Sequence, residues 1–145
     1  MTQTYEIFEL GHCTQDILVG VRRLVAQVSA EPVELSPDAL QQIAASADTH
    51  LFLLRAEGHI AGMCTVAFYR SPTGVKAWIE DVVVDECFRG RGFGRMLVQH
   101  AIGFSSARKG CKLMLTSRPA RAVANRMYAS MGFQRHDTNV YKMQL

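Results

Sequence analysis

The chain has 145 residues, of which 48% are hydrophobic and 20% are charged. This composition is typical of one globular domain, so we expect a single domain over residues 1–145 and exclude a fibre, a repeat array and a disordered chain. No apolar run reaches the ~18 residues of a membrane span, and the N-terminus lacks the basic then apolar pattern of a secretory signal. We therefore expect a cytoplasmic protein that does not act at a membrane.

The charge is divided unevenly along the chain. Residues 1–85 carry five basic and eleven acidic side chains, whereas residues 86–145 carry eleven basic and two acidic ones. A basic half attracts phosphate groups, and an acidic half attracts a cation such as an ammonium group. Solvated Lys and Arg side chains that only favour solubility would give the same totals, so charge alone leaves both interpretations open.

The four cysteines give no sign of a metal site. They are twenty or more residues apart, with no CxxC pair and no His at zinc-ligand spacing. We therefore expect no bound metal.

The first half of the chain predicts a strand, two helices and a hairpin. Residues 5–10 resemble an edge strand, and apolar residues then recur at helical spacing from the N-cap Thr14 until Glu31-Pro32. Ser36-Pro37 opens a second, short helix. From His50 the pattern changes to two strand-like runs, residues 51–55 and 60–69, joined by the turn dipeptide Glu57-Gly58.

The second half predicts strands that alternate with helices. Residues 75–84 end in three valines that are apolar on both faces, which is typical of a central strand. A long helix over residues 92–108, a buried strand over 111–116, a helix over 120–131 and a last strand over 139–145 follow. The order β-α-α-β-β-β-α-β-α-β indicates a mixed α/β layer fold.

The segment between the valine strand and the long helix is the most informative. Glycines at 90, 92 and 94 remove side chains where a ligand must approach the backbone at the positive end of a helix dipole. Arg89, Arg91 and Arg95 surround this turn with positive charge, which predicts a phosphate-binding loop. The spacing fits neither the dinucleotide fingerprint nor a Walker A loop.

Arg89-x-x-Gly92-x-Gly94 resembles the (Q/R)xxGx(G/A) pyrophosphate loop of the GNAT superfamily of acyl-CoA-dependent N-acetyltransferases. Tyr128, four residues before Gly132-Phe133, is similar to a later motif of that family, and the likeness covers residues 50–135. The resemblance implies a mixed, mostly antiparallel sheet of six or seven strands with splayed central parallel strands, flanked by about four helices. Acetyl-CoA would lie in the splay as cosubstrate, bound by Val82, Val83 and Val84 at the pantetheine and by Arg89, Gly90, Arg91, Gly92, Phe93, Gly94 and Arg95 at the pyrophosphate.

Tyr128 is a candidate catalytic residue on a polar face of the last helix. The resemblance implies that it protonates the departing thiolate, but a phenol of pKa ~10 is a weaker acid than a thiol of pKa ~8.5, so a hydrogen bond to the thiolate is the simpler role. Packing of its ring into the core is the alternative. Many family members carry an Asn where this chain has Arg121, and Asn125 is the cofactor-binding candidate present.

Glu80 and Asp81 are candidates for accepting the proton of an amine. Strand alternation puts them on opposite faces unless a bulge redirects them. Glu80 is the first candidate for the base, because Trp78 and Val82 on its face would form a partly apolar pocket that raises its pKa. A strand-end acid paired with a nearby Arg is the alternative.

The sequence thus predicts an N-acetyltransferase in which a small-molecule or protein amine attacks acetyl-CoA directly in a ternary complex. A noncatalytic acyl-CoA-binding regulatory module is the alternative. A nucleic-acid partner is not expected, because the basic residues gather at the loop and the phenylalanines fall at core positions. The habit of the family implies a homodimer.

Overall fold

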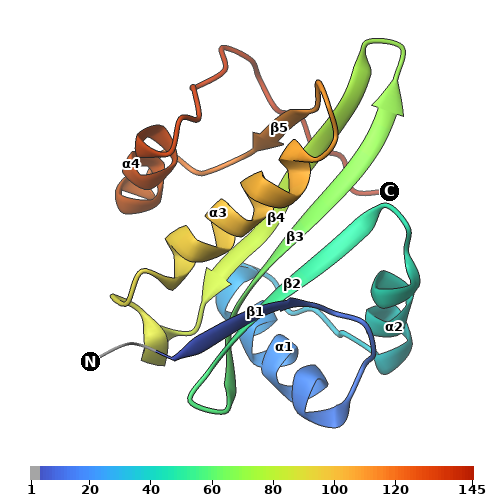
Figure 1. Ribbon diagram of the computed structural model, residues 1–145, viewed down its shortest axis with the longest axis vertical. Helices are drawn as coiled ribbons and strands as arrows, with labels where there is room; N and C mark the ends of the chain where they lie inside the picture. The colour runs from blue at the N-terminus through green and yellow to red at the C-terminus, as the bar shows by residue number, and fades with distance from the viewer. Residues whose placement is uncertain (1–3) are drawn as a thin grey trace.

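The computed structural model describes residues 4–145. Over these residues it has five strands, four α-helices and one short 3-10 helix (Figure 1). Their order and bounds are β1 (Tyr5–Glu9), α1 (Gln15–Val28), α2 (Pro37–Ala45), β2 (Thr49–Ala56), β3 (His59–Ser71), β4 (Gly74–Val84), η1 (Glu86–Phe88), α3 (Phe93–Ser106), β5 (Lys112–Leu115) and α4 (Ala122–Ser130).

The strands form one mixed sheet in the order β1-β2-β3-β4-β5. The first three pairs are antiparallel, and β4 and β5 are parallel. The sequence-based order of elements is confirmed from β1 to α4, as are the edge strand at the N-terminus and the hairpin of β2 and β3.

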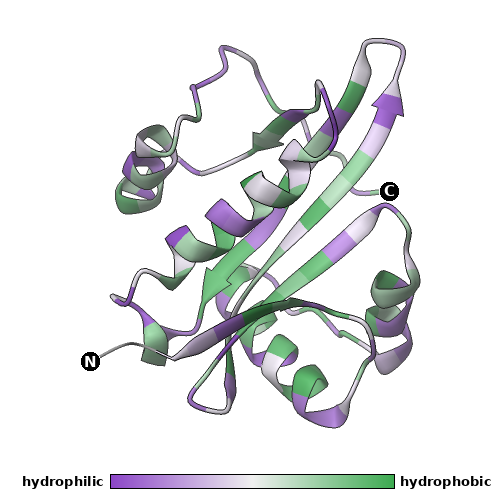
Figure 2. Ribbon diagram, in the orientation of Figure 1, coloured by the Kyte–Doolittle hydropathy of each residue, from purple (hydrophilic) through white to green (hydrophobic). Residues whose placement is uncertain are grey.

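Each face of the sheet has its own hydrophobic core, because alternate residues of the strands point to opposite sides. On β2, Phe52 and Leu54 belong to the core beneath α3 and α4, whereas Leu51 and Leu53 belong to the core beneath α1 and α2. Figure 2 shows hydrophobic residues along the central strands, and hydrophobic and hydrophilic residues in alternation along the helices, as expected of helices with one face on a core. The fold is therefore a sheet between two helical layers.

Local sequence explains how the helices begin and how closely they pack. The Ser36 hydroxyl accepts a hydrogen bond from the Ala39 backbone N–H at 3.0 Å, and Pro37 occupies the first turn of α2. On α1, a Cβ atom added at Gly20 would lie 2.7 Å from the Cβ of Ile60 on β3. Only glycine permits this close approach of α1 to the sheet.

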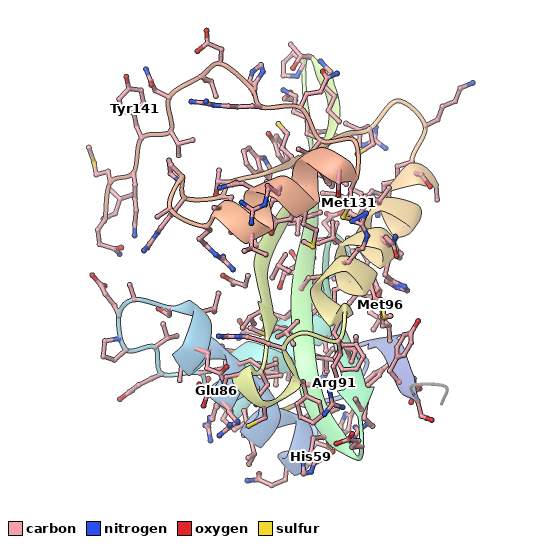
Figure 3. All side chains as sticks on the ribbon, turned by 90° about the vertical axis from the view of Figure 1, so that its left-hand side faces the viewer. His59, Glu86, Arg91, Met96, Met131 and Tyr141 are labelled. Atoms are coloured by element: carbon pink, nitrogen blue, oxygen red, sulfur yellow. The ribbon has the colours of Figure 1, made fainter. Side chains whose placement is uncertain are left out.

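The sequence-based count of six or seven strands is wrong for the residues described, which form five. Residues 139–145 alternate in polarity, yet they pair with no strand, and Tyr141 is 89% exposed. Figure 3 shows Tyr141 on a C-terminal segment that stands clear of the sheet. Residues 111–116 were expected to be a buried strand, but β5 is half-buried because it has a strand neighbour on one side only.

Residues 4–145 contain neither a helix suited to cross a membrane nor a cluster of side chains placed to bind a metal. None of their helices combines the length and the apolar character that crossing a bilayer requires. No group of three or more His, Cys, Asp or Glu side chains among them is placed to hold a metal ion.

Candidate functional site

The glycine loop joins β4 to α3 and is anchored at both ends. Asp85 caps η1, since its carboxylate accepts a hydrogen bond from the Cys87 backbone N–H at 3.0 Å. Phe88 closes η1 and Phe93 opens α3, and both rings are buried with their centroids 6.4 Å apart. The Phe93 side chain thus belongs to the core, so only its backbone can contact a ligand at the loop.

The start of α3 leaves donor groups without a partner. Gly90 and Gly92 have φ values of +82° and +81°, in the left-handed region that favours glycine. No side chain caps α3, and its first backbone hydrogen bond runs from Met96 N to Gly92 O at 3.1 Å. The N–H groups of residues 93–95 therefore have no partner in the described part of the chain, and they lie at the positive end of the helix dipole. This geometry suits a phosphate group.

Two of the loop arginines are held by neighbouring segments. The Arg89 Nε donates a hydrogen bond to the Val84 carbonyl at 3.2 Å, which ties the loop to the end of β4. The Arg91 guanidinium bonds to the Glu57 carboxylate in the turn between β2 and β3 at 2.8 Å. Figure 3 shows Arg91 below Met96, at the end of the molecule where α3 begins. Both arginines are exposed, so they add positive charge to the surface around the loop.

Side chains of helix α1 bind the segment that leads into the glycine loop. Asp85 is only 4% exposed, and its carboxylate bonds to the Arg23 Nε at 2.5 Å. The hydrogen bond from Arg23 lowers the pKa of Asp85 to about 2, although burial alone would raise this pKa. One turn further along α1, the Gln27 side-chain oxygen accepts a hydrogen bond from the Glu86 backbone N–H at 3.0 Å. The loop is therefore fixed to a helix on the opposite face of the sheet.

The pairing between the parallel strands β4 and β5 ends before β4 reaches this loop. The last paired residues are Ile79 on β4 and Leu115 on β5, where β5 ends. Residues 80–84 continue β4 for five more positions with no strand on the β5 side among the described residues. The β5 side of β4 over residues 80–84 therefore has backbone N–H and carbonyl groups that pair with no strand among the described residues, and this edge leads toward the glycine loop.

Tyr128 lies on α4 with its ring in the core. The residue is 8% exposed, and its ring meets that of Phe133 edge-on at a centroid distance of 6.0 Å. Burial raises the pKa of the Tyr128 hydroxyl, and the nearby Arg121 charge opposes this effect. The hydroxyl makes no hydrogen bond to residues 4–145. The Tyr128 ring therefore packs in the core while its hydroxyl remains available as a hydrogen-bond donor. This hydroxyl stays protonated at neutral pH.

The rest of α4 connects to the loop and to the preceding turn. The Arg95 guanidinium donates to the Ser130 hydroxyl at 3.0 Å, which joins the beginning of α3 to the end of α4. The Asn125 amide donates to the Arg118 carbonyl at 2.9 Å, so its NH₂ group stabilises the turn before the helix. Arg121 occupies the N-cap position of α4 and is exposed.

A β-bulge separates Glu80 from the valines. Thr65 pairs with Glu80 and Met63 with Val83, so Cys64 on β3 lies opposite two residues of β4. Asp81 has φ +52°, which is rare for a residue other than glycine. The bulge brings the two acids near each other: desolvation raises the pKa of Glu80, and the Asp81 charge raises it further.

The bulge also corrects one expectation about this strand. Val82 does not share the face of Glu80, because the extra residue turns Val82 toward the core beneath α3. Trp78 is the half-buried neighbour that remains on the Glu80 face, and its Nε1 donates to the Tyr69 hydroxyl at 3.4 Å. Of the two apolar neighbours expected beside Glu80, only the Trp78 ring is therefore on its face.

These features define a class of protein: an α/β domain with a glycine-rich loop at an uncapped helix N-terminus and a central strand whose end is unpaired on one side. Residues 20–133 match the acetyltransferase (GNAT) family. The chain belongs to this family.

Known relatives agree with this assignment. Streptothricin acetyltransferase from Streptomyces lavendulae is 35% identical over 88 residues, which are 60% of this chain and 46% of the relative. The match thus spans less than half the length of that curated relative. A putative acetyltransferase from Agrobacterium tumefaciens str. C58 has a TM-score of 0.83 at 25% identity over 96% of this chain and 99% of that one. AAC(6')-Iy, solved with the bisubstrate analog CoA-S-monomethyl-acetylneamine, has a TM-score of 0.77 at 17% identity over 98% and 99% of the two chains.

Sequence reasoning missed the residues that hold the loop in place. Arg23 and Asp85 are 62 residues apart, and Arg95 and Ser130 are 35 apart, so no local pattern relates them. The one available signal was the acid directly after an apolar strand, since a buried carboxylate requires a partner.

Proposed function

We propose that the protein transfers an acetyl group from acetyl-CoA to a primary amine of a small molecule, by direct attack within a ternary complex. The amine nitrogen attacks the thioester carbonyl carbon, a C–N bond forms, the C–S bond breaks, and CoA leaves as a thiolate. The observation that carries the proposal is the set of unpartnered N–H groups at residues 93–95, beside the unpaired edge of β4. We also place the reaction in the cytoplasm, where cysteines such as the free Cys64 stay reduced.

The cosubstrate would lie along the end of β4. The loop from Arg89 to Arg95 fits a pyrophosphate, because the backbone N–H groups of residues 93–95 lack partners and three guanidinium groups lie around them. Backbone groups of Val82, Val83 and Val84 would bind the pantetheine amides as an additional strand would. Asn125 keeps its side-chain oxygen for this role, since its NH₂ group is already bonded to Arg118.

Tyr128 would stabilise the departing thiolate by donating a hydrogen bond. Its raised pKa keeps the hydroxyl protonated, and it also makes complete proton transfer to a thiolate less favourable than for a free phenol. The hydroxyl has no competing partner in residues 4–145. Hydrogen bonding, rather than acid catalysis, is thus the role that its surroundings favour.

Glu80 would accept the proton that the amine loses. An alkylamine of pKa ~10.4 arrives mainly as ammonium, and an ordinary carboxylate is a weak base for it. Desolvation and the Asp81 charge both raise the pKa of Glu80 and so make it a stronger base. The two carboxylates also attract a cationic acceptor to this end of β4.

A small-molecule acceptor agrees with the relatives. The curated relative acts on streptothricin by its name, and AAC(6')-Iy binds an analog that joins CoA to acetylneamine. The pair of acids at the bulge suits such amine-bearing compounds. A protein amine is the competing acceptor class.

Calorimetric titration with acetyl-CoA and with CoA tests the cosubstrate. We expect saturable binding that Gly92→Glu abolishes, because this change places bulk and negative charge among the N–H donors. Gly103→Glu, on the exposed face of α3, is the matched control. Release of free thiol with a panel of amines then tests turnover: binding without turnover for every amine would favour the noncatalytic module, and no binding would refute the proposal.

A further inference from the structure

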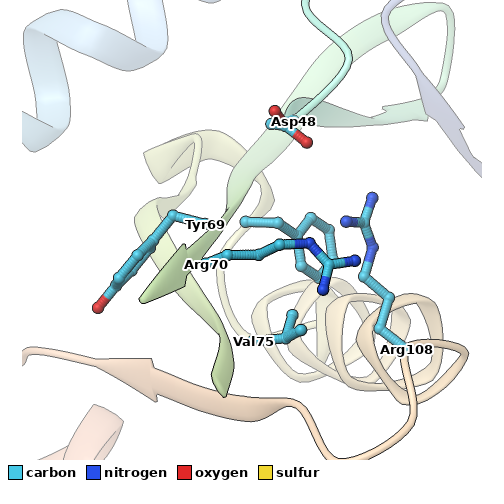
Figure 4. Close-up of a pocket in the computed structure, with 6 residues that line it drawn as sticks. Asp48, Tyr69, Arg70, Val75 and Arg108 are labelled. Carbon is cyan, nitrogen blue, oxygen red and sulfur yellow. The ribbon is translucent and has the colours of Figure 1, made fainter. Parts of the chain in front are cut away.

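A separate cavity lies at the other end of α3 from the glycine loop. Its volume is about 320 Å³, and its lining residues come from the segment just before β2, the hairpin of β3 and β4, and the turn after α3: Asp48, Phe68, Tyr69, Arg70, Val75 and Arg108 (Figure 4). The 14 residues of α3 span roughly 21 Å at 1.5 Å per residue. The cavity is therefore distinct from the proposed cosubstrate site.

Arg108 is held in this cavity by an aromatic ring. Its guanidinium carbon lies 3.6 Å from the centroid of Phe68, which is 5% exposed and belongs to the core. A guanidinium stacked in this way is restrained in position while its N–H donors point outward in its own plane. None of these donors bonds to another group in residues 4–145.

Arg70 directs a second guanidinium into the same space. Figure 4 shows the Arg70 side chain extending toward Arg108, whereas Tyr69 points away. Neither arginine forms an ion pair within the described residues, and Asp48 on the opposite wall is not within 4.0 Å of either guanidinium. Two like charges thus share one cavity whose single carboxylate pairs with neither of them, which is electrostatically unfavourable.

Three other arginines of the described residues are paired with acids of the chain itself. Arg23, Arg55 and Arg91 each bond to a carboxylate from a distant part of the sequence. The arrangement at Arg70 and Arg108 is complementary instead to a group that the chain does not supply. Carboxylates and phosphates match two guanidinium groups through paired N–H donors.

We propose that this cavity binds a small organic anion through a carboxylate or phosphate group held between Arg70 and Arg108. Its volume is at the lower end of the range for small-molecule sites, so the ligand is a compact metabolite. Asp48 repels a second negative group on the ligand and so limits its size and charge. This inference does not depend on the proposed acetyl transfer.

NMR titration of the ¹⁵N-labelled protein tests the site, with inorganic phosphate and the monocarboxylate lactate as separate probes at constant ionic strength. We expect saturable amide shifts at residues 48, 68–70, 75 and 108 with at least one probe. Arg70→Ala and Arg108→Ala should each weaken this binding about tenfold or more, as expected for loss of a charged hydrogen bond. Asp48→Asn should tighten it, because a repulsive charge is removed.

Lys109→Ala is the matched control, since it removes the same charge beside Arg108 from an exposed side chain outside the cavity. Its binding should stay within about twofold of the unaltered protein. Shifts confined to residues 89–95, equal weakening in Lys109→Ala, or no saturable shift with either probe would each overturn the proposal. Should Arg108→Ala disturb the packing of Phe68, the exposed Arg70 still decides the question.

Discussion

Replacing Asp85 by Asn tests whether α1 holds the glycine loop through a buried charge. The Asp85 side chain is 5% exposed and bonds to Arg23, and its pKa falls from 3.8 to about 2. Asn has the same shape and keeps one oxygen for the Cys87 N–H, so the substitution mainly removes the charge. We expect the folded protein to lose stability at neutral pH.

The size of this loss follows from the pKa change. A decrease from 3.8 to about 2 corresponds to about 2 kcal/mol at 1.36 kcal/mol per pKa unit. Because the Arg23 side chain is 53% exposed, solvent screening reduces the expected loss to between about 1 and 2 kcal/mol. The folded state has the lower pKa, so this stabilisation is complete above pH 3.8 and disappears as the pH falls toward 2.

Urea unfolding followed through the fluorescence of the single tryptophan, Trp78, measures this effect. The free-energy difference between the unaltered protein and Asp85→Asn should be full at pH 7 and should shrink below pH 4. Glu86→Gln is the matched control, because Glu86 is exposed and 4.0 Å from Arg23. An equal loss in the control, or a difference that does not change with pH, would refute the reasoning.

Substitutions at three further positions, Gly92, Tyr128 and Glu80, address the candidate site, with Gly103→Ala as a control. Gly92→Ala should weaken CoA binding and cost about 1 kcal/mol of stability because φ is positive there. Gly103→Ala inside α3 should instead stabilise the protein by up to about 1 kcal/mol. Calorimetry measures the CoA affinity and urea unfolding the stability, and equal changes in the two variants would contradict the left-handed cap at Gly92. Tyr128→Phe should lower kcat with little change in CoA affinity, and unchanged turnover would assign Tyr128 to packing alone. Glu80→Gln should lower kcat/KM about 100-fold or more and remove its acid limb, while a pH profile identical to that of the unaltered protein would exclude Glu80 as the base.

The helices and the hairpin were predictable because their signals are local. Apolar spacing, the Ser36 cap and the turn at Glu57-Gly58 act within a few residues, and the structure follows each of them. The last strand was not predictable by the same means. Residues 139–145 have a strand-like alternation, but a strand also requires a neighbour to pair with, and β5 has none on its outer side among residues 4–145.

The candidate site was predictable only where it follows a continuous motif. The glycine turn was recognised because its glycines and arginines are consecutive in the chain, and Gly90 and Gly92 have the positive φ values that such a turn requires. The bulge at Asp81 leaves no comparable trace, because a non-glycine residue with positive φ follows from the pairing of β3 with β4 rather than from its own side chain. The Arg23–Asp85 pair depends on the tertiary fold in the same way.

The position of the bulge explains why the two acids proposed to act on the acceptor lie beside the unpaired edge of β4 proposed for the cosubstrate. β4 last pairs with β5 at Ile79, and the bulge begins two residues later at Asp81. Up to Ile79 the strand is held on both sides, and beyond it the strand is held by β3 alone, so it can bend and twist away from β5. The bulge thus brings the Glu80 and Asp81 carboxylates near each other and turns Val82 toward the α3 face. It lies where the unpaired edge of β4 begins. Removing the bulge by deleting Asp81 should therefore impair acceptor use and CoA binding together, whereas Glu80→Gln should impair acceptor use and leave CoA binding unchanged.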